Sequence, residues 1–141
     1  MNLCVVDTSV VFKWYRQPDD EDHVLKALSI LEKHLNGELL IHVPDLLFYE
    51  LGNILRFKED NLLENPILIL RNTFLLGLTI HPLESLLSEV AFDLAKKYEI
   101  TFYDASFMAL SQILDVTFVT ADKKLYGMIE SFPGIELLAN F

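Results

Sequence analysis

The sequence contains almost no cysteine, because Cys4 is the only one among 141 residues. A single cysteine excludes an internal disulfide, which fits a protein of a reducing compartment. Since Cys4 lies inside a short apolar run, we interpret it as a small buried side chain rather than as a reactive thiol.

Glycine and proline are also scarce, with five of each, which leaves no room for a long flexible linker. No repeat and no low-complexity segment interrupts the sequence. The length is typical of one domain, and a hydrophobic content of 52% is enough for one well-filled core. We therefore predict a single domain over residues 1–141.

Export signals and long apolar runs are missing as well. The N-terminus lacks a basic start and reaches Asp7 early, which does not fit a signal peptide. The most apolar region, Pro66 to Ile80, is interrupted by Arg71 and Asn72, whereas a membrane-spanning helix needs about 20 nearly unbroken apolar residues. These absences favour a cytoplasmic protein that has no membrane partner.

Positive charge is the last scarce feature. The 11 lysines and arginines face 21 acids, so the formal net charge is −10. Proteins that bind nucleic acids usually carry basic faces, and this balance argues against strong unaided RNA binding. Bound divalent cations would offset part of the negative charge wherever the acids gather.

The sequence does contain short β-branched runs that alternate with amphipathic stretches. We expect strands at Leu3 to Val6, Leu39 to Val43, Leu78 to Ile80, Val116 to Thr120 and Ile135 to Leu138. We expect helices at Thr8 to Arg16, Val24 to Leu35, Pro44 to Leu55, Pro66 to Leu76, Glu84 to Tyr98 and Asp104 to Leu114, with a short one from Asp122. The alternation predicts an α/β fold with right-handed crossovers, in which helices cover both faces of a central, mainly parallel sheet of four to five strands.

Four acids stand where this topology would bring them to one edge of the sheet. Asp7 follows the first strand and Asp122 the fourth, whereas Glu50 and Asp104 lie near the N-termini of two helices. Ligands of such sheets bind outside the carboxyl ends of the strands. Carboxylates brought together repel one another, and a hard divalent cation such as Mg²⁺ or Mn²⁺ removes that cost. The four acids therefore predict a cation site.

Each acid also has a plainer explanation when it is taken alone. Asp7 would cap the helix that follows it, a position that aspartate favours. Asp104 and Asp122 would be N-terminal helix acids, and Glu50 would be a half-exposed helical acid. The prediction of a cation site depends on the common edge and not on any single residue.

Four segments resemble the motifs of the PIN-domain nucleases, in that family's order and over nearly the whole chain. They are Val5 to Ser9, Pro44 to Leu55, Ile100 to Leu110 and Phe118 to Leu125. The nearest branch is that of the VapC-like toxins of type II toxin–antitoxin systems. The resemblance implies a three-layer α/β/α PIN-like domain and a Mg²⁺- or Mn²⁺-dependent endoribonuclease.

The resemblance also assigns residues to a site. Its catalytic and metal-binding acids match Asp7, Glu50, Asp104 and Asp122. Its supporting polar positions match Thr8, Ser9, Asn53 and Thr120. It further implies an RNA substrate, an antitoxin protein that enters near the site, and a homodimer. One mild departure is Glu99, where relatives often carry glycine.

Basic and aromatic side chains near the acids are candidates for RNA contact. We predict that six bases rim the cleft and contact phosphates, although for any one of them taken alone an ordinary solvated residue is the better explanation; they are Lys13, Arg16, Arg56, Lys58, Lys123 and Lys124. Tyr103, Phe107 and Trp14 are candidates to stack on bases, with core packing the better explanation for Phe107. The four histidines show no metal-ligand spacing.

The two most apolar helical stretches, Leu46 to Leu55 and Ile67 to Leu76, carry more apolar side chains than one sheet face covers, which also favours a homodimer.

Two other functions fit parts of the pattern. A non-catalytic PIN-like module that binds protein or RNA would keep the fold, but four intact acids argue against a decayed site. A phosphotransfer receiver would need an acceptor aspartate after the third strand, where the sequence has Ile80 to Leu83. We therefore predict an RNA hydrolase, with the interaction module as the alternative.

Overall fold

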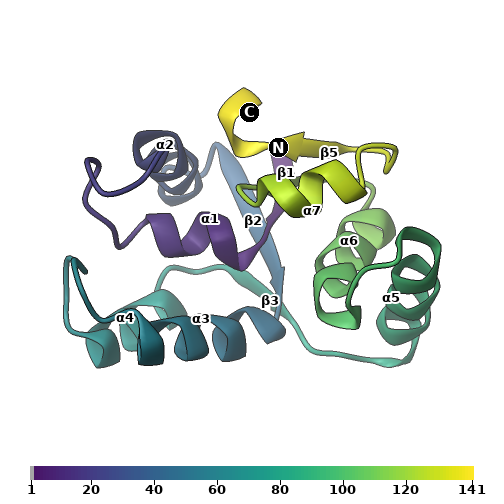
Figure 1. Ribbon diagram of the computed structural model, residues 1–141, viewed down its shortest axis with the longest axis horizontal. Coiled ribbons are helices and arrows are strands. Elements are labelled where there is room, and N and C mark those ends of the chain that lie inside the picture. The colour runs from purple at the N-terminus through teal and green to yellow at the C-terminus, as the bar shows by residue number, and fades with distance from the viewer. Residues whose placement is uncertain (1) are drawn as a thin grey trace.

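The computed structural model describes residues 2–141 and shows five strands and seven α-helices there (Figure 1). The strands are β1 (Asn2–Val6), β2 (Leu39–Pro44), β3 (Thr79–His81), β4 (Thr117–Thr120) and β5 (Ile135–Leu137). The helices are α1 (Thr8–Lys13), α2 (Val24–Leu35), α3 (Leu46–Phe57), α4 (Pro66–Phe74), α5 (Ser85–Tyr98), α6 (Phe102–Leu114) and α7 (Lys123–Met128), followed by a short 3-10 helix, Leu138–Asn140. Every predicted element is present, with its ends moved by a few residues.

Three of these shifts lie in segments that carry predicted site residues. Pro44 ends β2 instead of opening a helix, and Asp45 separates that strand from α3. The first helix stops at Lys13 instead of Arg16. The sixth helix begins at Phe102 because the Thr101 hydroxyl accepts the N–H of Asp104 at 3.0 Å, which places Asp104 in the first turn.

The neighbouring strands of the sheet are all parallel, in the order β3-β2-β1-β4-β5. The chain moves from β1 to β2 and β3 in one direction, and then returns to β4 on the other side of β1. The strand order therefore reverses at β1. In a parallel sheet, the crevice at such a reversal, outside the carboxyl ends of the strands, is where ligands bind.

Helices cover both faces of this sheet (Figure 1). Helices α1 to α4 lie on one side, while α6 packs against β1, β2 and β4 on the other side with α5 beside it. Helix α7 packs against β4 and β5. The predicted three-layer α/β/α arrangement is thus confirmed, with a sheet of five strands that is parallel throughout residues 2–141.

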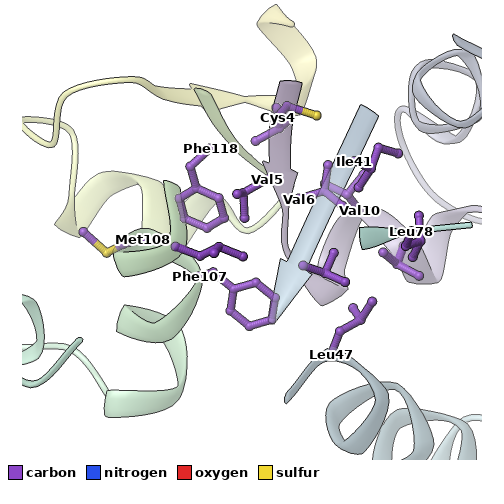
Figure 2. Packing of buried hydrophobic residues seen from close by; sticks show 14 of the residues in the cluster. Cys4, Val5, Val6, Val10, Ile41, Leu47, Leu78, Phe107, Met108 and Phe118 are labelled. Atoms are coloured by element: carbon purple, nitrogen blue, oxygen red, sulfur yellow. The ribbon is translucent and has the colours of Figure 1, made fainter. Parts of the chain in front are cut away.

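The core holds the central strand from both sides. Val5 and Val6 of β1 are fully buried, and successive strand residues point to opposite faces. Phe107 and Phe118 pack with Val5 on the α6 side, whereas Leu47 lies on the other side (Figure 2). This packing fixes the end of β1, and so the position of the residue that follows it.

The structure also bears on the single cysteine and on the lack of long apolar runs. Cys4 is buried, and its burial raises the pKa of the thiol to about 12, so the interpretation as a buried side chain is confirmed. Over residues 2–141, no helix has both the length and the apolar character that crossing a bilayer requires.

Candidate active site

Asp7 directly follows β1 and is only 7% exposed. Its Oδ1 accepts hydrogen bonds from the backbone N–H groups of Ser9 at 3.1 Å and Val10 at 3.4 Å, so Asp7 does cap α1. The same carboxylate accepts further hydrogen bonds from the hydroxyl of Ser9 at Oδ1 and from that of Thr120 at Oδ2. A capping aspartate needs only the backbone donors, so the two hydroxyls indicate an additional role.

The carboxyl group of Asp7 is difficult to ionise in spite of these donors. Its burial raises the pKa to about 7, although the hydrogen bonds from Ser9, Thr120 and Val10 lower it, and the nearby charge of Asp122 raises it further. Buried acids with strongly raised pKa values gather at functional sites. Asp7 therefore combines the position and the chemistry of a functional group.

Glu50 is half-buried on α3 and is held by the residue next to Asp7. The Thr8 hydroxyl donates a hydrogen bond to Oε1 of Glu50 at 2.6 Å, across 42 positions of sequence. Burial raises the pKa of Glu50, and the charge of Asp104 raises it further. The hydrogen bond fixes the second predicted acid to the start of α1.

Asp104 and Asp122 complete the predicted set. Burial raises the pKa of Asp104, and the charge of Asp122 raises it further. Asp122 is exposed and caps α7, since its side chain accepts the N–H of Leu125 at 3.0 Å. Like charges thus act between Asp7 and Asp122, between Asp122 and Asp104, and between Asp104 and Glu50. The fold therefore brings the four acids near one another in pairs at the carboxyl edge of the sheet.

Three of the four predicted supporting residues contact this cluster. Beyond the bonds already described, the Ser9 hydroxyl accepts the N–H of Ala121 at 3.0 Å, and the Thr120 hydroxyl accepts the N–H of Asp122 at 3.1 Å. Ser9 and Thr120 therefore join the end of β1 to the end of β4. Asn53 is exposed one turn after Glu50, and no hydrogen bond joins these two side chains in the part of the chain that the structure describes.

Two of the predicted RNA-contacting bases have partners within the chain. Lys13 Nζ lies 2.9 Å from Glu21 Oε1 and donates to the carbonyl of Asp22 at 2.7 Å. Arg16 Nε lies 3.3 Å from Glu21 Oε2, and its Nη1 donates to the carbonyl of Asp60 at 2.9 Å. These contacts tie loops to α1 and to the residues just after it, and they leave the two side chains less available to a phosphate.

The other predicted bases are exposed. None of them forms an ion pair within residues 2–141; they are Arg56, Lys58, Lys123 and Lys124. Among the aromatic candidates, Trp14 is buried and donates its indole N–H to the carbonyl of Ala27 at 2.9 Å, and Phe107 is also buried. Neither ring is available to a base, whereas Tyr103 is 61% exposed.

The donor set of the site fits a hard divalent cation. The cluster offers carboxylate and hydroxyl oxygens, which are the ligands that Mg²⁺ and Mn²⁺ prefer. The two ion pairs found among residues 2–141 do not involve the four acids, so no lysine or arginine side chain there pairs directly with them. Over the same residues, no three His, Cys, Asp or Glu side chains already lie in position to hold one ion. An ion would thus be held by one or two carboxylates, with water as the other ligands, a pattern that is typical of Mg²⁺.

The parallel sheet and the carboxylates at its reversal point define an α/β protein with an acidic site suited to metal-assisted hydrolysis. The chain belongs to the PIN domain family, whose model matches residues 4–129. This matched range includes all four acids. The predicted family is therefore confirmed. The chain is also similar to Ribonuclease VapC3 of Pyrobaculum aerophilum, with 28% identity over 93% of this chain and 95% of the relative.

Solved structures share the fold at lower identity. The chain is similar to PAE2754 from Pyrobaculum aerophilum, with a TM-score of 0.66 and 20% identity over 98% of this chain and 85% of that one. It is also similar to VapBC2 from Rickettsia felis bound to a DNA fragment from their promoter, with a TM-score of 0.67 and 16% identity over 96% of both chains. A toxin–antitoxin complex from Klebsiella pneumoniae gives a TM-score of 0.67 and 15% identity, over 98% of this chain and 99% of that one. These matches establish the three-layer fold.

Proposed function

We propose that the protein is a Mg²⁺- or Mn²⁺-dependent endoribonuclease that hydrolyses RNA phosphodiesters. The observation that carries this proposal is the environment of Asp7, a buried carboxylate with hydroxyl donors on both oxygens and with other acids around it. Such an arrangement is costly for folding unless a cation binds there. The similarity to Ribonuclease VapC3 supports RNA as the substrate.

In this proposal, some residues hold the divalent ion and others orient the carboxylates that hold it. Asp7 and Asp104 are the proposed direct ligands, and Glu50 and Asp122 act directly or through water. A divalent ion, when bound, would supply the Lewis acidity that activates water and stabilises the charge on the phosphate. Ser9 and Thr120 orient Asp7, and each hydroxyl donates to a different oxygen.

The polar groups around the acids have proposed roles in support and in RNA binding. Thr8 orients Glu50 through its hydrogen bond, and we assign Asn53 to the support of the same side chain. We assign the phosphate contacts to the exposed bases Arg56, Lys123 and Lys124. Lys13 and Arg16 would first have to leave Glu21, and so they rank below the exposed bases.

The partner of such a nuclease is proposed from its structural relatives. The toxin–antitoxin complex from Klebsiella pneumoniae and VapBC2 from Rickettsia felis share the fold. They support the proposal that this chain is the toxin of a type II system and binds an antitoxin protein. A cytoplasmic location, where RNA is available, belongs to the same proposal.

A homodimer is proposed from an apolar surface on α4 and the end of α3. Its exposed side chains are Phe57, Ile67, Leu68, Phe74 and Leu75. Large apolar side chains that stay exposed on neighbouring helices favour an interaction site, because exposing them to water is unfavourable. Light scattering should give twice the chain mass of 16.2 kDa, and a monomer at micromolar concentration would contradict the dimer.

The nuclease proposal is tested by cleavage of a single-stranded RNA oligomer. Wild-type protein should cleave it with Mn²⁺ or Mg²⁺, lose activity in EDTA and regain it when the metal is restored. Asp7→Asn should lower the rate about 1,000-fold, since the site loses several kcal/mol of transition-state stabilisation. Asp115→Asn, at the opposite edge of the sheet, is the control and should cleave like wild type.

The possible outcomes separate the two functions that fit the fold. Full activity of Asp7→Asn, or cleavage that EDTA does not affect, would refute the assignment. RNA binding by the wild-type protein without any cleavage would instead favour the non-catalytic interaction module.

A further inference from the structure

A second feature adjoins the acidic site. A cavity of about 260 Å³ lies between the starts of α3 and α6 and the segment before α5, and its lining is mostly apolar. It is lined by Leu46, Tyr49, Leu83, Leu87, Phe102 and Tyr103. This volume is slightly below the range of about 300–1,000 Å³ that is typical of pockets for drug-sized ligands. The cavity therefore suits one small group.

Two tyrosines connect this cavity to the acids. Tyr49 directly precedes Glu50 on α3, and Tyr103 directly precedes Asp104 on α6. Successive helix residues point about 100° apart, so each tyrosine faces the cavity while its neighbour faces the acidic cluster. Residues from the start of α3 and from the start of α6 line the same cavity, so the two helix starts lie close together. The cavity is thus directly beside the acidic cluster.

The exposure of both rings is unusual for large aromatic side chains. Tyr49 is 77% exposed and Tyr103 is 61% exposed, although both line a cavity. An aromatic ring left open to water retains its apolar area and its π-face for a ligand. Two such rings at one cavity point to a planar ligand that stacks.

The charge around the cavity selects which part of a nucleotide can enter. Asp45 lies in the lining, and the four acids lie next to it, so a phosphate would be repelled. A nucleobase is uncharged, planar and compatible with an apolar lining. Sequence-tolerant recognition of single-stranded RNA relies on stacking of splayed bases on aromatic side chains.

We propose that this cavity is a subsite for one unpaired nucleobase next to the cleaved phosphodiester, with Tyr49 and Tyr103 as its stacking residues. The inference rests on the proposed nuclease function and adds a positioning role for the base beside the scissile bond. Stacking holds the base in the ground state and in the transition state alike, so its loss should raise KM and leave kcat nearly unchanged.

The first test measures kcat and KM for a single-stranded RNA oligomer with Mn²⁺. Tyr49→Ala and Tyr103→Ala should each raise KM about 10-fold and change kcat less than about twofold. Tyr49→Phe and Tyr103→Phe keep the ring and should keep the wild-type KM. Phe92→Ala is the matched control, because Phe92 is an exposed aromatic side chain on α5 that does not line this cavity.

The second test removes the base instead of the ring. A series of oligomers, each with one abasic ribose moved along the strand, should show one position at which wild-type KM rises about 10-fold. At that position Tyr103→Ala should show no further rise, since the same interaction is already lost.

The outcomes distinguish this inference from the proposed function. Cleavage with an unchanged KM in both alanine variants, or full additivity of the abasic and Tyr103→Ala effects, would overturn the base subsite and leave the cavity to a protein partner. Failure of the wild-type protein to cleave any RNA would overturn the nuclease proposal itself and the subsite with it. Thermal melting of each variant confirms that these surface changes leave the fold intact.

Discussion

The two edges of the same parallel sheet differ in almost every property that matters for function. At the amino edge, a cavity of about 620 Å³ is lined by residues such as Asn2, Thr117 and Gly134, with Asp115 as its one carboxylate. At the carboxyl edge, Asp7 is buried among hydroxyls and further acids. The larger hollow therefore lies at the edge with less reactive chemistry.

The difference shows that strand direction, and not cavity size, locates the site. Side chains that follow β1 and β4 meet at the carboxyl edge because these strands are parallel neighbours. The reversal of the strand order at β1 opens a crevice at the same edge. Within residues 2–141, the acids whose pKa values are raised by burial and by like charges lie at this edge; they are Asp7, Glu50 and Asp104. This cost to the free protein is what a bound cation would relieve.

The largest expected contrast between the edges is in activity. Glu50→Gln and Asp104→Asn should each lower the rate of RNA cleavage about 100-fold or more, since each removes a carboxylate from the cation site. Asp115→Asn should stay within about twofold of wild type. Single-turnover cleavage of one oligomer by the three variants measures the contrast. Equal losses at both edges would contradict the assignment of the site to the carboxyl edge.

The next contrast is in the pH dependence of stability without metal. Asp7 has a pKa of about 7 in the folded protein, against an ordinary value of 3.8. Below about pH 4 the group is protonated in both states. As the pH rises to about 7, the unfolded chain releases its proton first, so the folded state loses stability.

Asp7→Asn removes this loss. Its free energy of unfolding should exceed that of wild type by roughly 2–4 kcal/mol above pH 7, and the gain should shrink as the pH falls toward 4. Urea denaturation between pH 5 and 8 in EDTA measures the difference, with Asp115→Asn as the control at the other edge. A pH-independent difference would show that Asp7 is not the titrating group.

A smaller effect is expected from the hydroxyls that orient Asp7. Ser9→Ala and Thr120→Val should each lower activity or metal affinity about 10- to 100-fold, because groups that orient a ligand matter less than the ligand. Ser111→Ala is the control, since its buried hydroxyl lines the amino-edge cavity and donates to the carbonyl of Met108. If Ser111→Ala reduced activity as much as Ser9→Ala, a general packing effect would explain both losses.

The smallest predicted difference concerns two helix ends in the left-handed conformation. Glu99 ends α5 near the acidic edge, and Asp115 ends α6 at the amino edge, each with φ of 55°. Glu99→Gly should raise the free energy of unfolding by about 1 kcal/mol, whereas Asp115→Gly should gain about 0.5 kcal/mol or less, because aspartate tolerates this conformation better. Chemical denaturation compares the two variants, and a larger gain for Asp115→Gly would contradict this explanation.

The predictable features of this protein have local causes. The apolar run before Asp7 and the one before Asp122 predict strands, and a rule of strand order then places both acids at one edge. The position of Glu99 also becomes clear, since glycine is the residue that the left-handed end of α5 favours. These inferences needed only neighbouring residues and the handedness of crossovers.

The features that sequence could not predict depend on contacts between distant segments. The Thr8 hydroxyl meets Glu50 across 42 positions, and the Thr120 hydroxyl meets Asp7 across 113. Trp14 directly follows α1 and was a candidate for base stacking, yet its indole is buried and donates to the carbonyl of Ala27. Such placements follow from how the helices pack on the sheet, which no local pattern contains.

The cavity beside the acids belongs to the same group of features. It exists because α3 and α6 bring Tyr49 and Tyr103, which are far apart in the sequence, to one place. The sequence predicted Tyr103 as a candidate for base stacking, but no motif or spacing in it indicated that Tyr49 lies beside Tyr103.

The most direct test of the central claim is calorimetric titration of Mn²⁺ into the purified protein at pH 8, where Asp7 is deprotonated. Wild type and Asp115→Asn should bind Mn²⁺ with the same affinity, and Asp7→Asn should bind at least about tenfold more weakly. Wild-type protein that binds no Mn²⁺, or Asp7→Asn that binds it as tightly as wild type, would contradict a cation site at the carboxyl edge of the sheet.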